Sequence, residues 1–180
     1  MFINPRHAIS EGWIKGIKNL DLQVQPNAID FTLDRVFSIS NNDFIISTDK
    51  TTGKELKQMR GGSEIQVVSD RRTGVEFFHL DDCSYDILSD VYVDIPAGTA
   101  ALLVVRSTFA RNAIWLASGL YDSGFKGHIG CVLHQSKGTS KVEKGTRVGQ
   151  VIFIDSENAK LYAGNYNHEV GTNAPHVGAH

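Results

Sequence analysis

The sequence lacks several features that would direct the search for a function elsewhere. It has only two cysteines, Cys83 and Cys131, and their spacing does not fit a metal-binding motif. It has no block of basic residues and a net charge of -2, so its charge pattern gives no sign of binding to a nucleic acid polymer. No apolar run approaches the length of a membrane span. We therefore predict neither a nucleic acid polymer nor a membrane among its partners.

The start of the chain also lacks the charged and then apolar segment that is typical of a secretion signal. Together with the low cysteine content, this predicts a reducing, cytoplasmic location, which for a viral protein is the host cytoplasm. The length of 180 residues and the hydrophobic content of 41% are sufficient for one domain with a sizeable core.

The apolar pattern predicts one short helix followed by many strands. Ile9, Trp13, Ile14 and Ile17 have helical spacing, and Asn4 and Pro5 are placed as the cap and the first residue of a helix over residues 5–17. Alternating apolar and polar residues then predict strands over residues 22–24, 29–33, 36–39, 44–46 and 67–94 and, further on, 100–105, 129–133 and 146–154. Residues 47–62 are polar and contain glycine, so we expect an excursion between strands there. This pattern predicts an all-β fold, either an antiparallel barrel or a jelly roll.

A set of residues suited to an anion follows the apolar run at residues 100–105. Arg106 contributes a permanent positive charge and a planar fork of donors, while Ser107 and Thr108 contribute hydroxyls. Such a group fits phosphate oxygens. A surface ion pair of Arg106 explains the same tripeptide equally well, so these three residues alone leave both interpretations open.

Asp122 is the only carboxylate between residues 94 and 143, and it lies in a turn-forming run, residues 121–124. An aspartate in a turn either accepts hydrogen bonds from its own backbone or takes part in chemistry. Elsewhere the acidic residues Asp81, Asp82, Asp86 and Asp90 lack a metal-loop spacing, so they predict a solvated face.

Four motifs in this order resemble the superfamily of the trimeric dUTPases and the dCTP deaminases. Residues 25–33 resemble the first motif, 106–108 the second, 119–130 the third and 144–150 the fourth. Each motif alone is a weak signal, but four in register are a strong one. The resemblance implies a distorted jelly-roll barrel with a short N-terminal helix, assembled as a homotrimer with active sites between subunits. It implies a single domain over residues 1–180: the helix in 1–20, the barrel in 22–162 and a mobile tail in 163–180.

One position separates the two branches of this superfamily. Deaminases carry a proton-transferring Glu in the strand after the third motif, and Val132 stands at that position here. Losing a positioned acid or base costs ~10²–10⁴-fold in rate. The zinc route to deamination needs a His-x-Glu and a Pro-Cys-x-x-Cys motif, which this chain lacks. The helix before the first motif and the C-terminal run 162–171 nevertheless resemble the deaminases.

The resemblance therefore favours a dUTP diphosphatase that hydrolyses dUTP to dUMP and pyrophosphate, and a phage-type dUTPase fits the mixture of motifs. Three alternatives stay open. The first is a dCTP deaminase or a bifunctional dCTP deaminase and dUTPase, and the second is a pyrophosphohydrolase directed at dCTP. The third is a barrel that binds nucleotide without catalysis.

The resemblance also assigns roles to residues. Asp122 orients and deprotonates the water that attacks the α-phosphorus, and Arg106 and Ser107 complete the predicted catalytic set. Phe125 stands where the family commonly has a tyrosine that stacks on the deoxyribose. The other predicted substrate-binding residues are Thr108, Arg111, Leu116, Ser118, Gly119, Gln150, Tyr162 and Tyr166.

The expected partners are a deoxypyrimidine triphosphate, with dUTP preferred, and other copies of the chain. Mg²⁺ is expected on the triphosphate, because a hard cation held by phosphates and waters needs few protein ligands. Asp30 has two readings. It either holds one of the metal-bound waters or has a structural role in the turn of the barrel.

Overall fold

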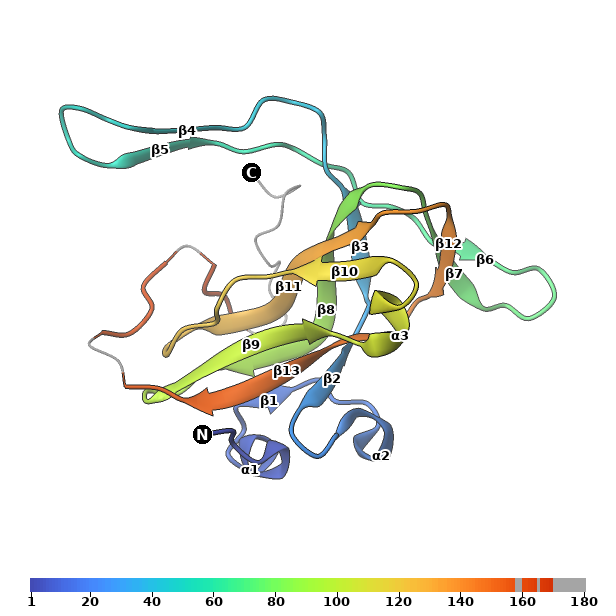
Figure 1. Ribbon diagram of the computed structural model, residues 1–180, viewed down its shortest axis with the longest axis horizontal. Coiled ribbons are helices and arrows are strands. Elements are labelled where there is room, and N and C mark those ends of the chain that lie inside the picture. The colour runs from blue at the N-terminus through green and yellow to red at the C-terminus, as the bar shows by residue number, and fades with distance from the viewer. Residues whose placement is uncertain (158–159, 165, 170–180) are drawn as a thin grey trace.

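The fold is built around the long strand β8, which pairs with neighbours on both sides in the largest of four sheets (Figure 1). The computed structural model describes residues 1–157, 160–164 and 166–169. The largest sheet has the order β1 (Ile14–Lys15), β8 (Ser84–Asp94), β11 (Lys126–Gln135), β10 (Ile114–Ala117), with β3 (Arg35–Ser38) also paired to β8. All of these pairs are antiparallel.

Three smaller sheets complete the fold. The second sheet has the order β2 (Ile29–Thr32), β13 (Arg147–Asp155), β9 (Thr99–Val105). The third consists of β12 (Ser140–Glu143), β7 (Glu76–Leu80) and β6 (Val68–Ser69), and the fourth of β4 (Ile45–Thr48) and β5 (Glu55–Gln58). The prediction of a mostly β protein is confirmed. The described strands do not join into one closed barrel.

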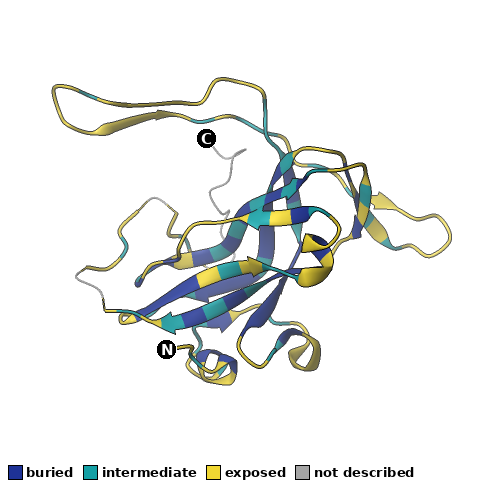
Figure 2. Cartoon of the chain, in the orientation of Figure 1, coloured by how far each residue is buried: buried dark blue, intermediate teal, exposed yellow. Residues whose placement is uncertain are grey.

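One apolar core lies between the first two sheets, and Figure 2 shows the buried inner positions of their strands. Phe31 and Phe153 contribute from the second sheet, and Ile87 and Leu133 from the first. Apolar residues alternate with less buried ones along β11 and β13, because successive side chains of a strand point to opposite faces of the sheet. This alternation leaves one face of each sheet available for other contacts.

The N-terminal helix is shorter than the sequence predicts. Helix α1 (Pro5–Ser10) begins as expected, with the Asn4 side chain accepting a hydrogen bond from the backbone N–H of Arg6 and with proline in the first turn. It ends at Ser10 rather than at residue 17, because Gly12 takes a φ of 74°, a left-handed conformation that terminates helices. The next residues form β1 and pair with β8.

Two predicted backbone assignments are wrong in detail. The strand predicted at residues 22–24 is largely replaced by the short helix α2 (Leu20–Gln23), because the Asn19 side chain caps its first turn by accepting from the backbone N–H of Leu22 at 3.1 Å. The excursion predicted at residues 47–62 is an ordered hairpin, β4 and β5, which extends away from the rest of the fold as an exposed arm (Figures 1 and 2).

The acidic residues of the β8 region do not all lie on a solvated face. Asp81 and Asp82 are exposed as predicted, but Asp86 and Asp90 are partly buried. Asp90 forms an ion pair with Lys18 and accepts a hydrogen bond from Thr32 Oγ1 at 2.5 Å. Lys18 and Thr32 lie against Asp90, and Asp86 has Phe37 and Val132 as its direct neighbours on the adjoining strands. In the described part of the chain, no helix is long and apolar enough to cross a membrane.

Candidate active site

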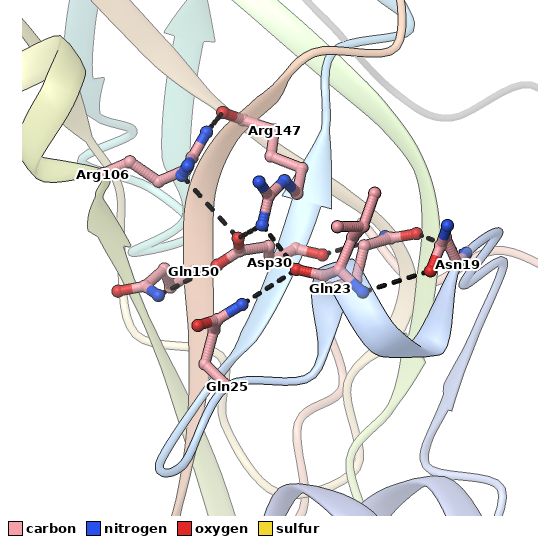
Figure 3. A network of polar contacts seen from close by, with 8 residues as sticks. Asn19, Gln23, Gln25, Asp30, Arg106, Arg147 and Gln150 are labelled. Atoms are coloured by element: carbon pink, nitrogen blue, oxygen red, sulfur yellow. Dashed lines mark hydrogen bonds and ion pairs between the residues drawn. The ribbon is translucent and has the colours of Figure 1, made fainter.

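Asp30 is the centre of a polar cluster that joins the first, second and fourth motifs (Figure 3). Its side chain is only 2% exposed. Oδ1 accepts a hydrogen bond from Gln150 Nε2 at 2.9 Å, and Oδ2 accepts one from Arg147 Nη1 at 2.9 Å. Arg106 Nε lies 3.7 Å from Oδ2. These contacts follow from the strand register, which pairs Asp30 directly with Gln150.

The Asp30 carboxylate holds two guanidinium groups side by side. Arg106 Nη1 also donates to the carbonyl oxygen of Arg147 at 2.8 Å, and both arginine side chains remain between a quarter and a third exposed. Without the carboxylate, these like charges would repel each other at short range. The cluster is therefore a positioned cationic group that can still reach an anion from solvent.

The same contacts test whether Asp30 fits a metal site. Both of its oxygens already interact with an amide or guanidinium N–H, which favours the structural role over direct metal ligation. Within the described residues, no group of three or more His, Cys, Asp or Glu side chains is arranged to hold a metal ion. The expectation that Asp30 holds a metal-bound water stays a prediction.

Replacing Asp30 by alanine is expected to reduce both stability and activity. The change leaves Gln150 and the two guanidinium groups without their shared acceptor, and each lost partner of a buried polar group costs ~1–3 kcal/mol. The free energy of unfolding, measured with urea, should fall by at least that amount. Asp34→Ala is the matched control, since Asp34 forms only a partly exposed pair with Lys144 at 3.4 Å, and such pairs contribute about 0–1 kcal/mol. Equal losses in the two variants would contradict the central role of Asp30.

The turn that carries Asp122 is fixed to the start of β9. Tyr121 exchanges both backbone hydrogen bonds with Ala101 at 2.9 Å. Ser123 Oγ donates to the carbonyl oxygen of Thr99 at 2.5 Å, and the Gly124 N–H donates to that of Ile95 at 2.7 Å. Asp122 itself is exposed. A rigid turn therefore presents this carboxylate to solvent.

Two other turn aspartates show what a purely local role looks like in this chain. Asp49 Oδ1 accepts from the backbone N–H groups of Thr51 and Thr52, and Asp70 Oδ1 accepts from those of residues 72 and 73. Asp122 has no such contact among the described residues, and the Gly124 N–H that would make one points instead to Ile95. The turn interpretation of Asp122 therefore loses its main support, and its carboxylate is available for chemistry.

A first cavity of about 360 Å³ lies beside this turn. Its volume is within the range of small-molecule sites, ~300–1,000 Å³. Five predicted substrate-binding residues line it: Ser118, Gly119, Phe125, Tyr162 and Tyr166. The ring of Phe125 packs edge-on against Tyr121, with centroids 4.8 Å apart, and against Tyr162 at 5.6 Å. Strand β10 lies at the sheet edge, so one side of its backbone is open to a ligand.

Val132, the position that separates the two branches, also lines the first cavity. The sequence contains no sign that Met59, His128 and His168 lie there too, and its pattern assigned the further lining residue Asp86 to a solvated face. Asp86 and Val132 are direct partners in the β8–β11 register, so their side chains share one face of the sheet. The alternation of residues along β8 shows which face of the strand carries Asp86. The sequence does not show that β11, with Val132, lies beside it.

The C-terminal segment forms one wall of the first cavity. The Tyr162 N–H donates to the carbonyl oxygen of Ser123 at 2.7 Å, and the His128 N–H donates to His168 Nε2 at 3.0 Å. Gly124 permits this close approach, because a Cβ added there would lie 2.9 Å from Leu161 Cβ. The predicted mobile tail, residues 163–180, lies mostly outside the described residues.

A second cavity, of about 650 Å³, lies at the other end of β9. Arg106 and Thr108 line it together with Lys137, Lys141 and Glu143. Three cations against one carboxylate leave the lining with a positive charge, which suits an anion. Ser107 is exposed in the short helix α3 (Ser107–Ala110), and Arg111 is exposed at its end. The Leu116 side chain is partly buried and packs against the core.

The Arg106 cluster and the Asp122 turn are close in sequence, but they lie apart in the structure of one chain. Tyr121 pairs with Ala101, and Arg106 lies five residues further along. At ~3.3 Å per residue, the Asp122 turn and Arg106 are separated by roughly 16 Å. A single chain therefore does not bring this carboxylate and this guanidinium to one phosphate.

The family of the chain follows from comparison with known proteins. The dCTP deaminase-like family matches residues 4–156. The chain belongs to this family. The resemblance read from the four motifs is thereby confirmed.

Curated relatives carry both activities in their names. A probable deoxyuridine 5′-triphosphate nucleotidohydrolase of Methanococcoides burtonii is 28% identical over 160 residues, which cover 87% of this chain and 88% of that protein. A protein of the same name from Methanopyrus kandleri is 31% identical over 146 residues, covering 80% and 87%. A dCTP deaminase of Pyrobaculum islandicum is 30% identical over 90 residues, covering 49% and 51%.

A solved structure supports the fold. The crystal structure of 2′-deoxycytidine 5′-triphosphate deaminase from Agrobacterium tumefaciens matches with a TM-score of 0.59 and 18% identity. The match covers 84% of this chain and 46% of that chain, so this member of the dCTP deaminase-like family spans about half the length of that protein.

Proposed function

We propose that the protein is a dUTP diphosphatase, which converts dUTP and water to dUMP and pyrophosphate. The observation that carries the proposal is the carboxylate of Asp122, which a fixed turn holds at the surface without the local hydrogen bonds that Asp49 and Asp70 make. The dUTP nucleotidohydrolase names of relatives that match along most of their length support this substrate. Val132 favours hydrolysis over deamination, since its side chain cannot transfer a proton.

In this mechanism Asp122 accepts a hydrogen bond from a water and directs it at the α-phosphorus. The new bond joins the water oxygen to that phosphorus, and the bond to the α,β-bridging oxygen breaks, so pyrophosphate leaves. The water proton passes to Asp122 and then to solvent. An ordinary aspartate is a weak base at neutral pH, so most of the acceleration comes from positioning and from cations around the phosphates.

The phosphates would be met by Arg106 and Gln150, which Asp30 holds in place, and by Ser107 and Thr108. The substrate is the nucleotide with its divalent cation, which we propose to be Mg²⁺. Phe125 would pack on the deoxyribose in the first cavity, and the edge backbone of β10 would read the base. Arg111, Leu116, Ser118, Gly119, Tyr162 and Tyr166 complete the proposed contacts.

The proposal includes a homotrimer of distorted jelly-roll subunits, in which residues of one subunit complete the active site of the next. Two observations support it. The Asp122 turn and the Arg106 cluster lie at opposite ends of β9, so a neighbouring chain would supply the second group where both act on one phosphate. Leu102 and Val104 are 39% and 43% exposed on the outer face of β9, where burial in an assembly would stabilise them. We propose that this enzyme works in the cytoplasm.

The test is to incubate the protein with each deoxynucleoside triphosphate and to measure pyrophosphate and ammonia separately. Pyrophosphate from dUTP without ammonia from dCTP is the expected result. Ammonia from dCTP would instead identify a deaminase, and no product from any nucleotide would favour a binding protein.

A further inference from the structure

We propose that Asp86 makes cytosine acceptable in the first cavity, so that dCTP is a second substrate for the release of pyrophosphate. The inference rests on the proposed function. It concerns a residue that the sequence pattern assigned to a solvated face and that neither the motifs nor the comparisons single out.

Asp86 faces the part of the first cavity that a pyrimidine ring would fill. It pairs with Val132 on one side of β8 and with Phe37 on the other, and Val132 in turn pairs with Ala117 of β10. These four residues form one row across the sheet, and Asp86, Val132 and Ala117 all line the cavity. Asp86 is the only carboxylate among the described residues that line it.

The opposite end of the cavity fixes the direction of a bound nucleoside. Phe125, the proposed sugar contact, packs on the ring of Tyr121, and Tyr121 Oη donates to the carbonyl oxygen of Gly130 at 2.6 Å. The Tyr121 side chain therefore spans the space between Phe125 and Gly130. Val132 lies two residues after Gly130 along β11, on the same face of the strand. A base extending from a sugar at Phe125 points its far edge toward Val132 and Asp86.

Other groups around this position respond to the charge of Asp86. Burial raises the pKa of the Cys131 thiol to about 12, and the negative charge of Asp86 adds to that shift. Burial also raises the pKa of Tyr121, and Cys131 and Asp86 contribute in the same direction. The Asp86 carboxylate is thus close enough to the cavity wall to act on groups there.

Hydrogen-bond chemistry decides which base a carboxylate accepts. An ionised carboxylate only accepts hydrogen bonds, and cytosine presents an exocyclic amino group at position 4, for which Asp and Glu are suitable partners. Uracil presents an oxygen at that position, and its ring N–H lies between two carbonyl oxygens that repel a carboxylate. Compared with an uncharged residue at this position, Asp86 therefore favours the binding of cytosine over that of uracil.

The reaction on dCTP is the same as on dUTP. A water oxygen bonds to the α-phosphorus, the bond to the α,β-bridging oxygen breaks, and dCMP and pyrophosphate form with the amine left on the ring. Val132 supplies no group to remove this amine. Asp86 acts here as a specificity-determining residue, and it does not contact the reacting phosphorus.

The experiment compares the efficiencies, kcat/KM, for dCTP and dUTP in the wild type and in Asp86→Asn. The wild-type efficiency for dCTP should be within about tenfold of that for dUTP. In the variant the ratio of dCTP to dUTP efficiency should fall by about tenfold, since the amide can donate to the uracil oxygen, and one good pair with a base edge changes discrimination to this extent. Asp94→Asn is the matched control, because Asp94 also lies on β8 but pairs with Lys126 at 2.9 Å away from the cavity.

A ratio unchanged within twofold in Asp86→Asn would overturn the inference while dUTP hydrolysis, and with it the proposed function, still stands. Pyrophosphate from neither nucleotide in the wild type would overturn both. Ammonia from dCTP would also overturn the inference, because the amine would then be the reacting group. If Asp86→Asn does not fold, as judged by its thermal melt, Asp86→Ser gives the same comparison with a shorter side chain.

Discussion

Replacing Asp122 by asparagine is expected to lower the turnover of dUTP by ~10²-fold or more, the lower range for a positioned acid or base. Asparagine keeps the size of the side chain but removes the base and its charge. Binding of a non-hydrolysable α,β-imido analogue of dUTP should survive, and it can tighten because the phosphates no longer face a carboxylate. Steady-state kinetics and calorimetric titration of the analogue measure the two effects separately.

The same substitution discriminates sharply between the two interpretations of this residue. If Asp122 served only its turn, asparagine would be the substitution best tolerated there, since both side chains make the same local hydrogen bonds. Asp49→Asn is the matched control, because Asp49 is an exposed turn aspartate with that local role. Near wild-type hydrolysis by Asp122→Asn would remove the catalytic assignment.

A mixture of two inactive variants is expected to regain activity if each site draws on two subunits. Arg106→Ala removes charge-assisted contacts to phosphate that contribute roughly 1.5–3 kcal/mol each, so its efficiency should fall by more than about tenfold, while Asp122→Asn loses the water-directing carboxylate. The two variants are mixed in equal amounts, unfolded together and refolded, so that chains combine at random in closed rings. An intact site takes Asp122 from an Arg106→Ala chain and Arg106 from an Asp122→Asn neighbour, and about a quarter of all sites have this combination. Activity near that fraction of the wild type is the expected result.

The refolding experiment carries its own control. Each variant refolded alone should stay at its low activity, which excludes a gain from refolding itself. Sites built within one chain would give a mixture no more active than the average of its two components. Light scattering on the wild type should also show a trimer, and a stable monomer with full activity would contradict the shared site.

The sequence predicts the fold class well because the determining pattern is local. Alternating apolar residues mark β8, β11 and β13, and the Asn4 and Pro5 cap is read from its own residues. The prediction fails where one residue overrides a longer pattern. Gly12 ends α1, although the apolar residues on both sides of it have helical spacing. The prediction also misses β5, whose polar residues resemble a loop although they pair in register with β4.

The candidate site is harder to predict, because it depends on which strands become neighbours. The motifs identify Asp30, Arg106 and Gln150, but only the register of β2, β13 and β9 shows that Asp30 holds the other two. Asp86 is far from every motif in sequence and reaches the first cavity through pairing with Val132. Conversely, Arg106 and Asp122 are close in sequence, and the strand direction separates them.

Hydrolysis of dUTP in water enriched in ¹⁸O tests the central claim most directly. A water directed by Asp122 at the α-phosphorus places its oxygen on that atom. Mass spectrometry of the products should therefore find one ¹⁸O atom in the phosphate of dUMP and none in pyrophosphate. Label in pyrophosphate, or release of single phosphates in its place, would contradict attack at the α-phosphorus and the role given to Asp122.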